Sequence, residues 1–294
     1  MKWGMFMTKR MLAAGAAVLA LGLVAPISGN YAYSGIVMAC EESAPGGAPE
    51  GIPYSTGIGY MSGVVSRDIY SDKDGTLLME AKTFEVNLSQ EDAVKYPKLQ
   101  ASLKKLSRQN LTDMDNLTTS WKPDLTESYE VGRESGMYEK GNAPFSYELS
   151  YGGLRADSTV FSCYGTEYVY LGGAHPTTAY DAYVFDTKSG KRLGLDDILQ
   201  STDNLAEIIA NEANGVEEYR ERLPERAELV KSIRELMDKR LLKFGLTEDG
   251  LRIFFSNYDI GPYAIGTFII DIPQSRHFNI FNPKYIFYGS RPRG

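Results

Sequence analysis

The chain has 294 residues, 38 acidic and 31 basic, and a formal net charge of −7 at pH 7. Three of the basic residues and none of the acidic ones precede Cys40, so the remainder carries 38 acidic residues against 28 basic ones. This balance argues against nucleic acid and anionic membrane as partners, and it favours attraction of a cationic protein. Solubility alone would also account for the excess negative charge.

The N-terminus has the layout of a secretory signal peptide. Basic residues precede the apolar run Met11–Ala25, which Pro26 ends. We therefore expect residues 1–39 to direct export to the periplasm or the extracellular space. The run is short for a membrane span, and an uncleaved N-terminal anchor is the less favoured alternative.

Two explanations fit Cys40. Val37–Ala39 before it resembles a bacterial lipobox, although Met38 and the distance from the apolar run depart from that pattern. Lipidation of Cys40 would anchor the protein to a membrane. The alternative is a disulfide with Cys163, because two cysteines in an exported chain often form one bridge. The sequence leaves both open.

Residues 40–53 are rich in Glu, Ser, Pro, Gly and Ala and offer almost no anchor for a core, so we expect a flexible tether. The remaining chain is long enough for one large or two small hydrophobic cores. We predict two small α+β domains, consecutive or intertwined, at residues 54–171 and 172–294.

In the first half, Gly59–Tyr70 and Thr76–Leu88 alternate as strands around an Asp-Gly turn, which predicts a hairpin. Pro97 suits a helix start, and leucines follow it at helical spacing until Trp121–Asp124, where Pro123 is expected to close the helix. Three further strands are predicted: Tyr129–Tyr138, Ala143–Leu154 and Thr159–Leu171.

In the second half, helices are expected from Asp196 to Gly215 and from Pro224 to Gly245. The last predicted strands are Leu251–Phe255, Gly266–Ile272 and Tyr285–Tyr288. Because strands surround a few helices without βαβ alternation, the fold class is α+β, with antiparallel sheets and packed helices.

A turn between two alternating strands holds Gly172, Gly173 and His175. Imidazole titrates near neutrality, and glycine amides can approach a ligand closely, so this turn is a candidate site. Asp181, in the next strand, could orient the imidazole if the two side chains met. Pro176 instead favours a purely structural role for His175, because it forces an extended or turn conformation on the residue before it.

The loop Asn257–Tyr263 is the second candidate, with Tyr258, Asp259 and Tyr263 as its binding residues. Tyrosines can stack on sugars or anchor protein partners. They are also good strand formers, which explains many of the 20 tyrosines without any function.

We expect no metal and no cofactor. The nitrogen and sulfur ligand candidates lack motif spacing, and Ser71–Gly75 has too few oxygens for calcium. The chain contains no GxSxG, HExxH or phosphate-binding glycine loop, so hydrolase chemistry has no positive support and we predict no catalytic residue. The nitrogen and sulfur side chains considered as metal ligands are His175, His277, Cys40 and Cys163.

The motifs GGAHP, YVFDTKSGKRLGLDDIL and LTEDGLRIFFSNYDIGPYAIGTFIIDIP resemble a bacterial exported two-domain family of unknown function. The same pair of domains resembles the region before the catalytic domain of PdaC-type peptidoglycan deacetylases and the extracytoplasmic, lysozyme-binding part of RsiV-type anti-sigma factors. Tyr60–Tyr170 is similar to the first domain loosely, and Tyr180–Ile272 is similar to the second more closely.

Two departures shape what the resemblance implies. Only ten residues precede the apolar run, whereas an RsiV-like regulator carries a sigma-binding segment there, so sigma-factor control is not expected. No metal-dependent domain follows, so deacetylation is not expected either. The resemblance therefore implies a non-enzymatic cell-envelope binding or sensor module for a cationic, lysozyme-like protein. The alternatives are an accessory protein that binds peptidoglycan or another glycan, and an envelope hydrolase or deacetylase that uses His175.

Overall fold

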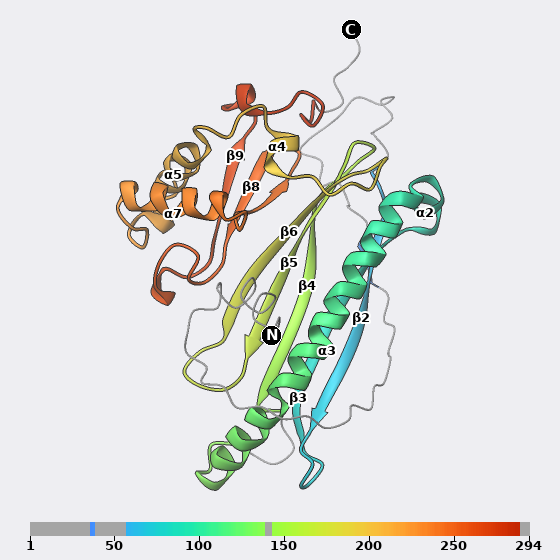
Figure 1. The fold of residues 1–294 in the computed structure, drawn as a ribbon, viewed down its shortest axis with the longest axis vertical. Helices are drawn as coiled ribbons and strands as arrows, with labels where there is room; N and C mark the ends of the chain where they lie inside the picture. Colours follow the sequence, from blue (N-terminus) through green and yellow to red (C-terminus); the bar gives the residue numbers. More distant parts are fainter. Residues whose placement is uncertain (1–35, 39–56, 139–142, 289–294) are drawn as a thin grey trace, which may run out of the picture.

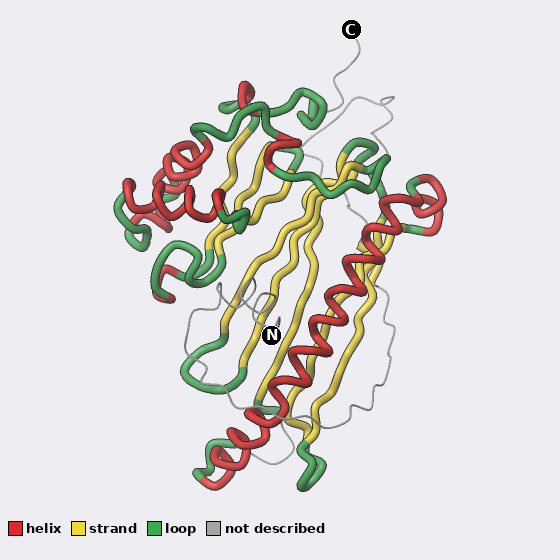
Figure 2. Tube along the Cα trace, in the orientation of Figure 1, coloured by secondary structure: helices red, strands yellow, loops and turns green. Residues whose placement is uncertain are grey.

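The computed structural model describes residues 36–38, 57–138 and 143–288, and it has an α+β fold, as predicted (Figure 1). Figure 2 shows one long helix lying lengthwise along the larger sheet, with a short helix at one of its ends and the helices of the second half gathered near a smaller sheet. Cys40 and the predicted tether lie outside the described residues. None of the described helices is both long enough and apolar enough to span a membrane.

The larger sheet has the strand order β1-β2-β3-β4-β5-β6. Its strands are β1 (Ile36–Met38), β2 (Tyr60–Tyr70), β3 (Leu77–Leu88), β4 (Phe145–Ala156), β5 (Val160–Tyr170) and β6 (Thr177–Asp186). The β2–β3 hairpin is confirmed, and Gly75 in its turn has φ 69°. β1 belongs to the segment predicted as signal peptide. β3 and β4 run parallel, and the other neighbours run antiparallel.

The parallel pair needs a crossover, which a short helix α2 (Gln90–Lys95) and the long helix α3 (Pro97–Glu134) provide. β3, α3 and β4 therefore form one βαβ unit, and the larger sheet is mixed because of this one parallel pair. The predicted helix end at Trp121–Asp124 and the strand Tyr129–Tyr138 were wrong, because the helix continues through Pro123. Its buried stripe continues in Leu125 and Tyr129, and packing of that stripe outweighs the local cost of an interior proline.

The second half begins with helices and ends in the smaller sheet, of order β7-β8-β9. The helices are α4 (Leu195–Ile198), α5 (Leu205–Gly215), α6 (Glu217–Arg220) and α7 (Arg226–Asp238); the strands are β7 (Lys243–Leu246), β8 (Gly250–Phe255) and β9 (Phe268–Pro273). Helix α7 ends before the predicted Gly245, which lies in β7 against the side chain of Leu154. Tyr285–Tyr288 is not a strand; Tyr285 and Ile286 instead fill the core.

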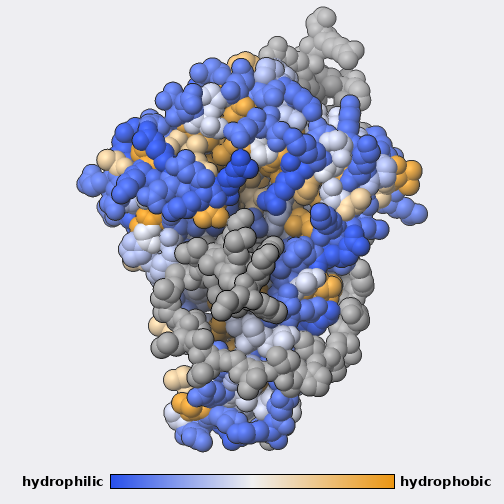
Figure 3. Space-filling view, viewed as in Figure 1, coloured by the Kyte–Doolittle hydropathy of each residue, from blue (hydrophilic) through white to orange (hydrophobic). Residues whose placement is uncertain are grey.

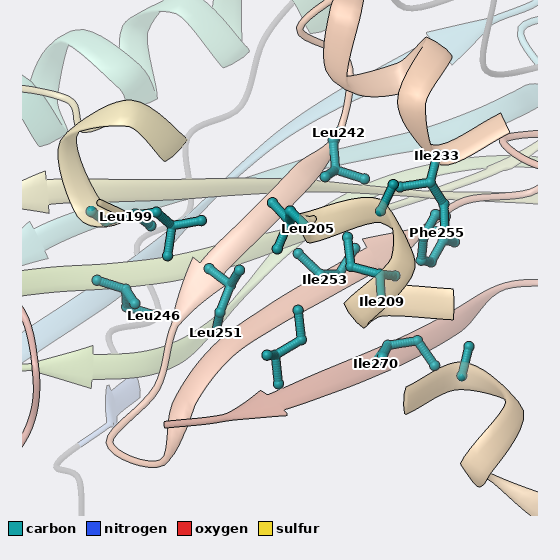
Figure 4. Close-up of a cluster of buried hydrophobic side chains, with 14 of the residues drawn as sticks. Leu199, Leu205, Ile209, Ile233, Leu242, Leu246, Leu251, Ile253, Phe255 and Ile270 are labelled. Atoms are coloured by element: carbon teal, nitrogen blue, oxygen red, sulfur yellow. The ribbon is translucent and has the colours of Figure 1, made fainter. Parts of the chain in front are cut away.

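Two hydrophobic clusters hold these layers together. The first lies between α3 and one face of the larger sheet. The second lies between α5, α7 and the smaller sheet, and Figure 4 shows Leu205 and Ile209 of α5 facing Ile253 and Ile270 of the strands. It also includes Val160 and Val184 of the larger sheet. The predicted domain boundary at 171/172 falls between β5 and β6, which pair along their whole length.

Candidate functional site

The predicted turn at His175 connects β5 to β6. Gly172 and Gly173 have φ values of 90° and 97°, in the left-handed region that favours glycine. Gly172 also lies close to the side chains of Tyr138 and Phe145, while Gly173 has open space around it. His175 is exposed, and its Nδ1 lies 3.3 Å from the carbonyl oxygen of Pro176. The turn therefore presents the imidazole at the surface.

His175 stacks on Tyr263, which comes from the connection between β8 and β9. The ring centroids are 3.7 Å apart and the planes differ by 13°. Tyr258 packs against the same tyrosine, with centroids 5.8 Å apart at 48°. The hydroxyl of Tyr263 donates a hydrogen bond of 3.0 Å to the carbonyl of Pro176. We call His175, Tyr258 and Tyr263 the aromatic cluster; it unites residues that the sequence placed in two separate candidate loops.

A buried ion pair positions the loop that carries the two tyrosines. Lys243 Nζ lies 3.1 Å from Asp259 Oδ2, and the Asp259 side chain is only 6% exposed. The same carboxylate accepts the Ser256 N–H at 2.7 Å, and Ser256 Oγ accepts the Tyr180 N–H of β6 at 2.9 Å. The Asp259 carboxylate therefore anchors the loop to β7 and to the start of the loop itself.

Asn257 extends this attachment along the edge of β6. Its Oδ1 accepts the Thr178 N–H at 3.0 Å, and its own N–H donates to the Thr178 carbonyl at 3.4 Å. Tyr258 follows with φ 69°, a left-handed conformation that is costly for a non-glycine residue. The attachments on both sides hold that conformation, so the aromatic cluster sits on a fixed support.

Asp181 does not join His175. Its Oδ2 accepts a hydrogen bond of 2.7 Å from the Tyr183 hydroxyl, and its Oδ1 accepts the Ala182 N–H at 3.0 Å. Between Thr177 and Asp181 the strand already advances about 13 Å, at about 3.3 Å per residue. The carboxylate is therefore too far along β6 to orient the imidazole.

Asp181 instead lines a cleft with a volume of about 750 Å³. The cleft lies between β6, the segment 192–196, the end of α7 and β7. Arg192 crosses it, with its guanidinium 4.6 Å above the ring of Tyr183 and Nη2 donating 3.0 Å to the Ala182 carbonyl. Glu167 of β5 also lines the cleft and accepts a hydrogen bond of 2.9 Å from the Tyr147 hydroxyl.

Sequence reasoning missed Glu167 and Arg192. The period-two alternation of β5 and β6 was visible, and it places Glu167 and Asp181 on one face once Gly165 is paired with Asp181. That register depends on tertiary pairing, and Arg192 reaches the strand only because the turn after Asp186 folds back on it.

The surface over the smaller sheet and its helices is mostly hydrophilic (Figure 3).

Cys163 does not contribute a reactive thiol. It is a buried free cysteine, and burial, with a smaller effect of Asp181, raises the pKa of its thiol to about 12 despite the opposing charge of Arg192. Its predicted partner Cys40 lies outside the described residues. Within the described part of the chain, no three His, Cys, Asp or Glu side chains group so that they could hold a metal ion.

Residues 196–275 match the sequence model of DUF3298, a protein family of unknown function. The matched segment includes Tyr258, Asp259 and Tyr263 but not the first half of the chain. The prediction that the chain resembles a family of unknown function is confirmed for residues 196–275. No curated protein matches the chain.

Two solved structures of DUF3298 family members resemble this one. The protein from Bacteroides fragilis is 14% identical, with 79% of this chain and 96% of that chain covered and a TM-score of 0.51. The protein from Pseudomonas aeruginosa is 15% identical, with 92% and 100% covered and a TM-score of 0.44. At 14% identity, the resemblance to the Bacteroides fragilis protein shows a shared fold and nothing about function.

Proposed function

We propose that the protein is a non-enzymatic, exported binding or sensor module of the cell envelope that holds a cationic, lysozyme-like protein. The observation that carries the proposal is the stack of His175 on Tyr263, which presents aromatic rings on loops fixed by a buried ion pair. Binding residues often lie on loops held by a rigid scaffold, and tyrosine is enriched among the residues that dominate interface energies.

Charge and resemblance support the choice of partner. From Cys40 onward the chain carries 38 acidic against 28 basic residues, which steers a cationic protein toward it. The resemblance to PdaC-type and RsiV-type envelope regions implies the same class of partner. Export through the signal peptide, with anchoring through a lipidated Cys40, would bring the module to the place where such enzymes act.

A glycan partner is the second candidate. Tyr168 is 40% exposed on β5, and its cross-strand neighbours Glu148 and Thr178 add polar groups on the same face of the sheet. Aromatic rings among such groups suit sugar binding. A hydrolase or deacetylase that uses His175 comes third, because Asp181 lies away from the imidazole and Nδ1 faces a backbone carbonyl.

The test is a titration of the purified protein against lysozyme and against peptidoglycan at low and moderate salt. Tyr263→Ala should weaken lysozyme binding by roughly tenfold or more, since it removes the ring on which both neighbours pack. Tyr168→Ala is the matched control on the sheet face and should leave lysozyme binding unchanged. Added salt should weaken the complex.

Retention on peptidoglycan without lysozyme binding, with loss on Tyr168→Ala, would replace the protein-binding proposal with the glycan one. Absence of binding to both probes would refute both.

A further inference from the structure

The edge of β6 is unusual because side chains occupy the places where another strand would bond. β6 is the last strand of the larger sheet, and residues 178, 180, 182 and 184 direct their backbone groups away from β5. Asn257 and Ser256 cover one end of this edge, and the Leu193 N–H donates to the Val184 carbonyl at the other.

Between these covered ends, the edge faces the cleft. The Ala182 carbonyl accepts a hydrogen bond from the exposed side chain of Arg192, and the Ala182 N–H is held by the neighbouring Asp181 carboxylate. Arg192 is exposed and has no ion-pair partner within the described residues. A side chain of this kind protects a strand edge and can move away when a peptide backbone offers better-placed hydrogen bonds.

The part of the cleft formed by β5 and β6 carries carboxylates and tyrosine rings, and we call it the acidic floor; Arg240 and Lys243 also line the cleft. Glu167 and Asp181 lie on the same face of adjacent strands as diagonal neighbours, each half-buried beside a tyrosine ring. A carboxylate offers about four acceptor positions, so Asp181 can also accept a cation beside the tyrosine hydroxyl that it binds. A volume of about 750 Å³ accommodates a few residues of extended chain.

We propose that this cleft binds an extended peptide segment that adds a short strand to β6 and directs a lysine or arginine side chain to Glu167 and Asp181. The peptide backbone replaces Arg192 on the Ala182 carbonyl. Side chains alternate along a strand, so every second residue of the peptide points to the acidic floor. The site is separate from the aromatic cluster, and the inference does not rest on the proposed function.

Fluorescence anisotropy with the purified protein tests this, with a fluorescein-labelled heptapeptide Gly-Val-Lys-Val-Lys-Val-Gly, capped at both ends, as the probe. A second probe carries N-methyl groups on alternate backbone nitrogens, which keeps the side chains and their charges but removes the donors. Strand addition predicts roughly tenfold or weaker binding of the methylated probe. It also predicts slower amide hydrogen exchange in Tyr180–Val184 when the first probe is bound.

The acidic floor is tested with the double variant Glu167→Gln and Asp181→Asn, in which the amide oxygens can still accept the tyrosine hydroxyls. We expect it to bind the lysine probe roughly tenfold more weakly. Asp271→Asn, at an exposed ion pair on β9, is the control; it removes one carboxylate where the double variant removes two, and it should change binding by less than about twofold.

Three results would overturn the proposal: no binding of the lysine probe, equal binding of the methylated probe, or an equal loss in the Asp271→Asn protein. The last two would show attraction of basic peptides to the acidic surface as a whole.

Discussion

At the scale of single residues, Asp186 shows how hydrogen bonds to a carboxylate outweigh the effect of burial on its pKa. Its side chain is 12% exposed at the end of β6. Burial alone would raise the pKa of the carboxyl, but the hydrogen bond from Lys284 at 2.7 Å and those from the amide and hydroxyl of Ser189 lower the pKa to about 2. The charged form of Asp186 therefore ties the C-terminal segment to the turn after β6.

This carboxyl should contribute to acid unfolding. Its pKa is lower in the folded protein than in the unfolded chain, so its stabilisation is complete above about pH 4 and is lost as the pH falls toward about 2. Asp186→Asn should lower the free energy of unfolding by about 1 to 2 kcal/mol at neutral pH and by progressively less below about pH 4. Urea unfolding of both proteins at several pH values measures this difference. A constant difference across the range would contradict it.

At the scale of elements, the turn after β6 packs directly on the first turns of α3. The Ser102 hydroxyl donates 2.8 Å to the Gly190 carbonyl, and a Cβ at position 190 would collide with the carbonyl of Lys98. Gly190 also has φ 66°. The turn that shapes one end of the cleft is thus fixed by the helix of the other cluster.

Gly190→Ala should destabilise the protein by about 2 to 4 kcal/mol, because it adds a backbone collision to the strain of a left-handed residue. Gly75→Ala is the matched control: its φ is 69° and a Cβ there meets no atom within 4 Å. That variant should lose only about 1 kcal/mol. Chemical denaturation of both variants measures the two losses, and equal losses would show that α3 tolerates displacement.

The elements also show where sequence reasoning reaches its limit. Hairpin β2–β3 and helices α5 and α7 follow from local signals, as do the candidate loops at His175 and Tyr263. The continuation of α3 past Pro123 does not, because it depends on a buried face that only the folded sheet provides. The cleft likewise depends on strand register. A sequence pattern could single out Asp181, but it could not predict that Glu167 and Arg192 line the same cleft.

At the scale of the whole molecule, the two sheets share interior contacts. Val160 and Val184 of the larger sheet belong to the cluster under α5 and α7. Ser162 Oγ accepts the Leu246 N–H at 2.9 Å in a buried bond between β5 and β7. Arg155, on β4, donates 2.6 Å to the carbonyl of Tyr285 near the described end of the chain. If either sheet unfolded without the other, the donors and acceptors of these hydrogen bonds would lose their partners.

The described structure should therefore unfold in one transition. Trp121 packs beside the first cluster, and Ile209 is fully buried in the second, so each reports on a different core. In a Trp3→Phe background, Ile209→Ala should lower stability by about 2 to 5 kcal/mol and shift the urea midpoint of Trp121 fluorescence together with that of far-ultraviolet circular dichroism. Independent domains would give the opposite result: the Trp121 midpoint would stay in place while the dichroism signal split into two steps. Leu103→Ala, in the first cluster, is the reciprocal variant, and in a cooperative molecule it moves both signals equally because the shared sheet transmits the loss.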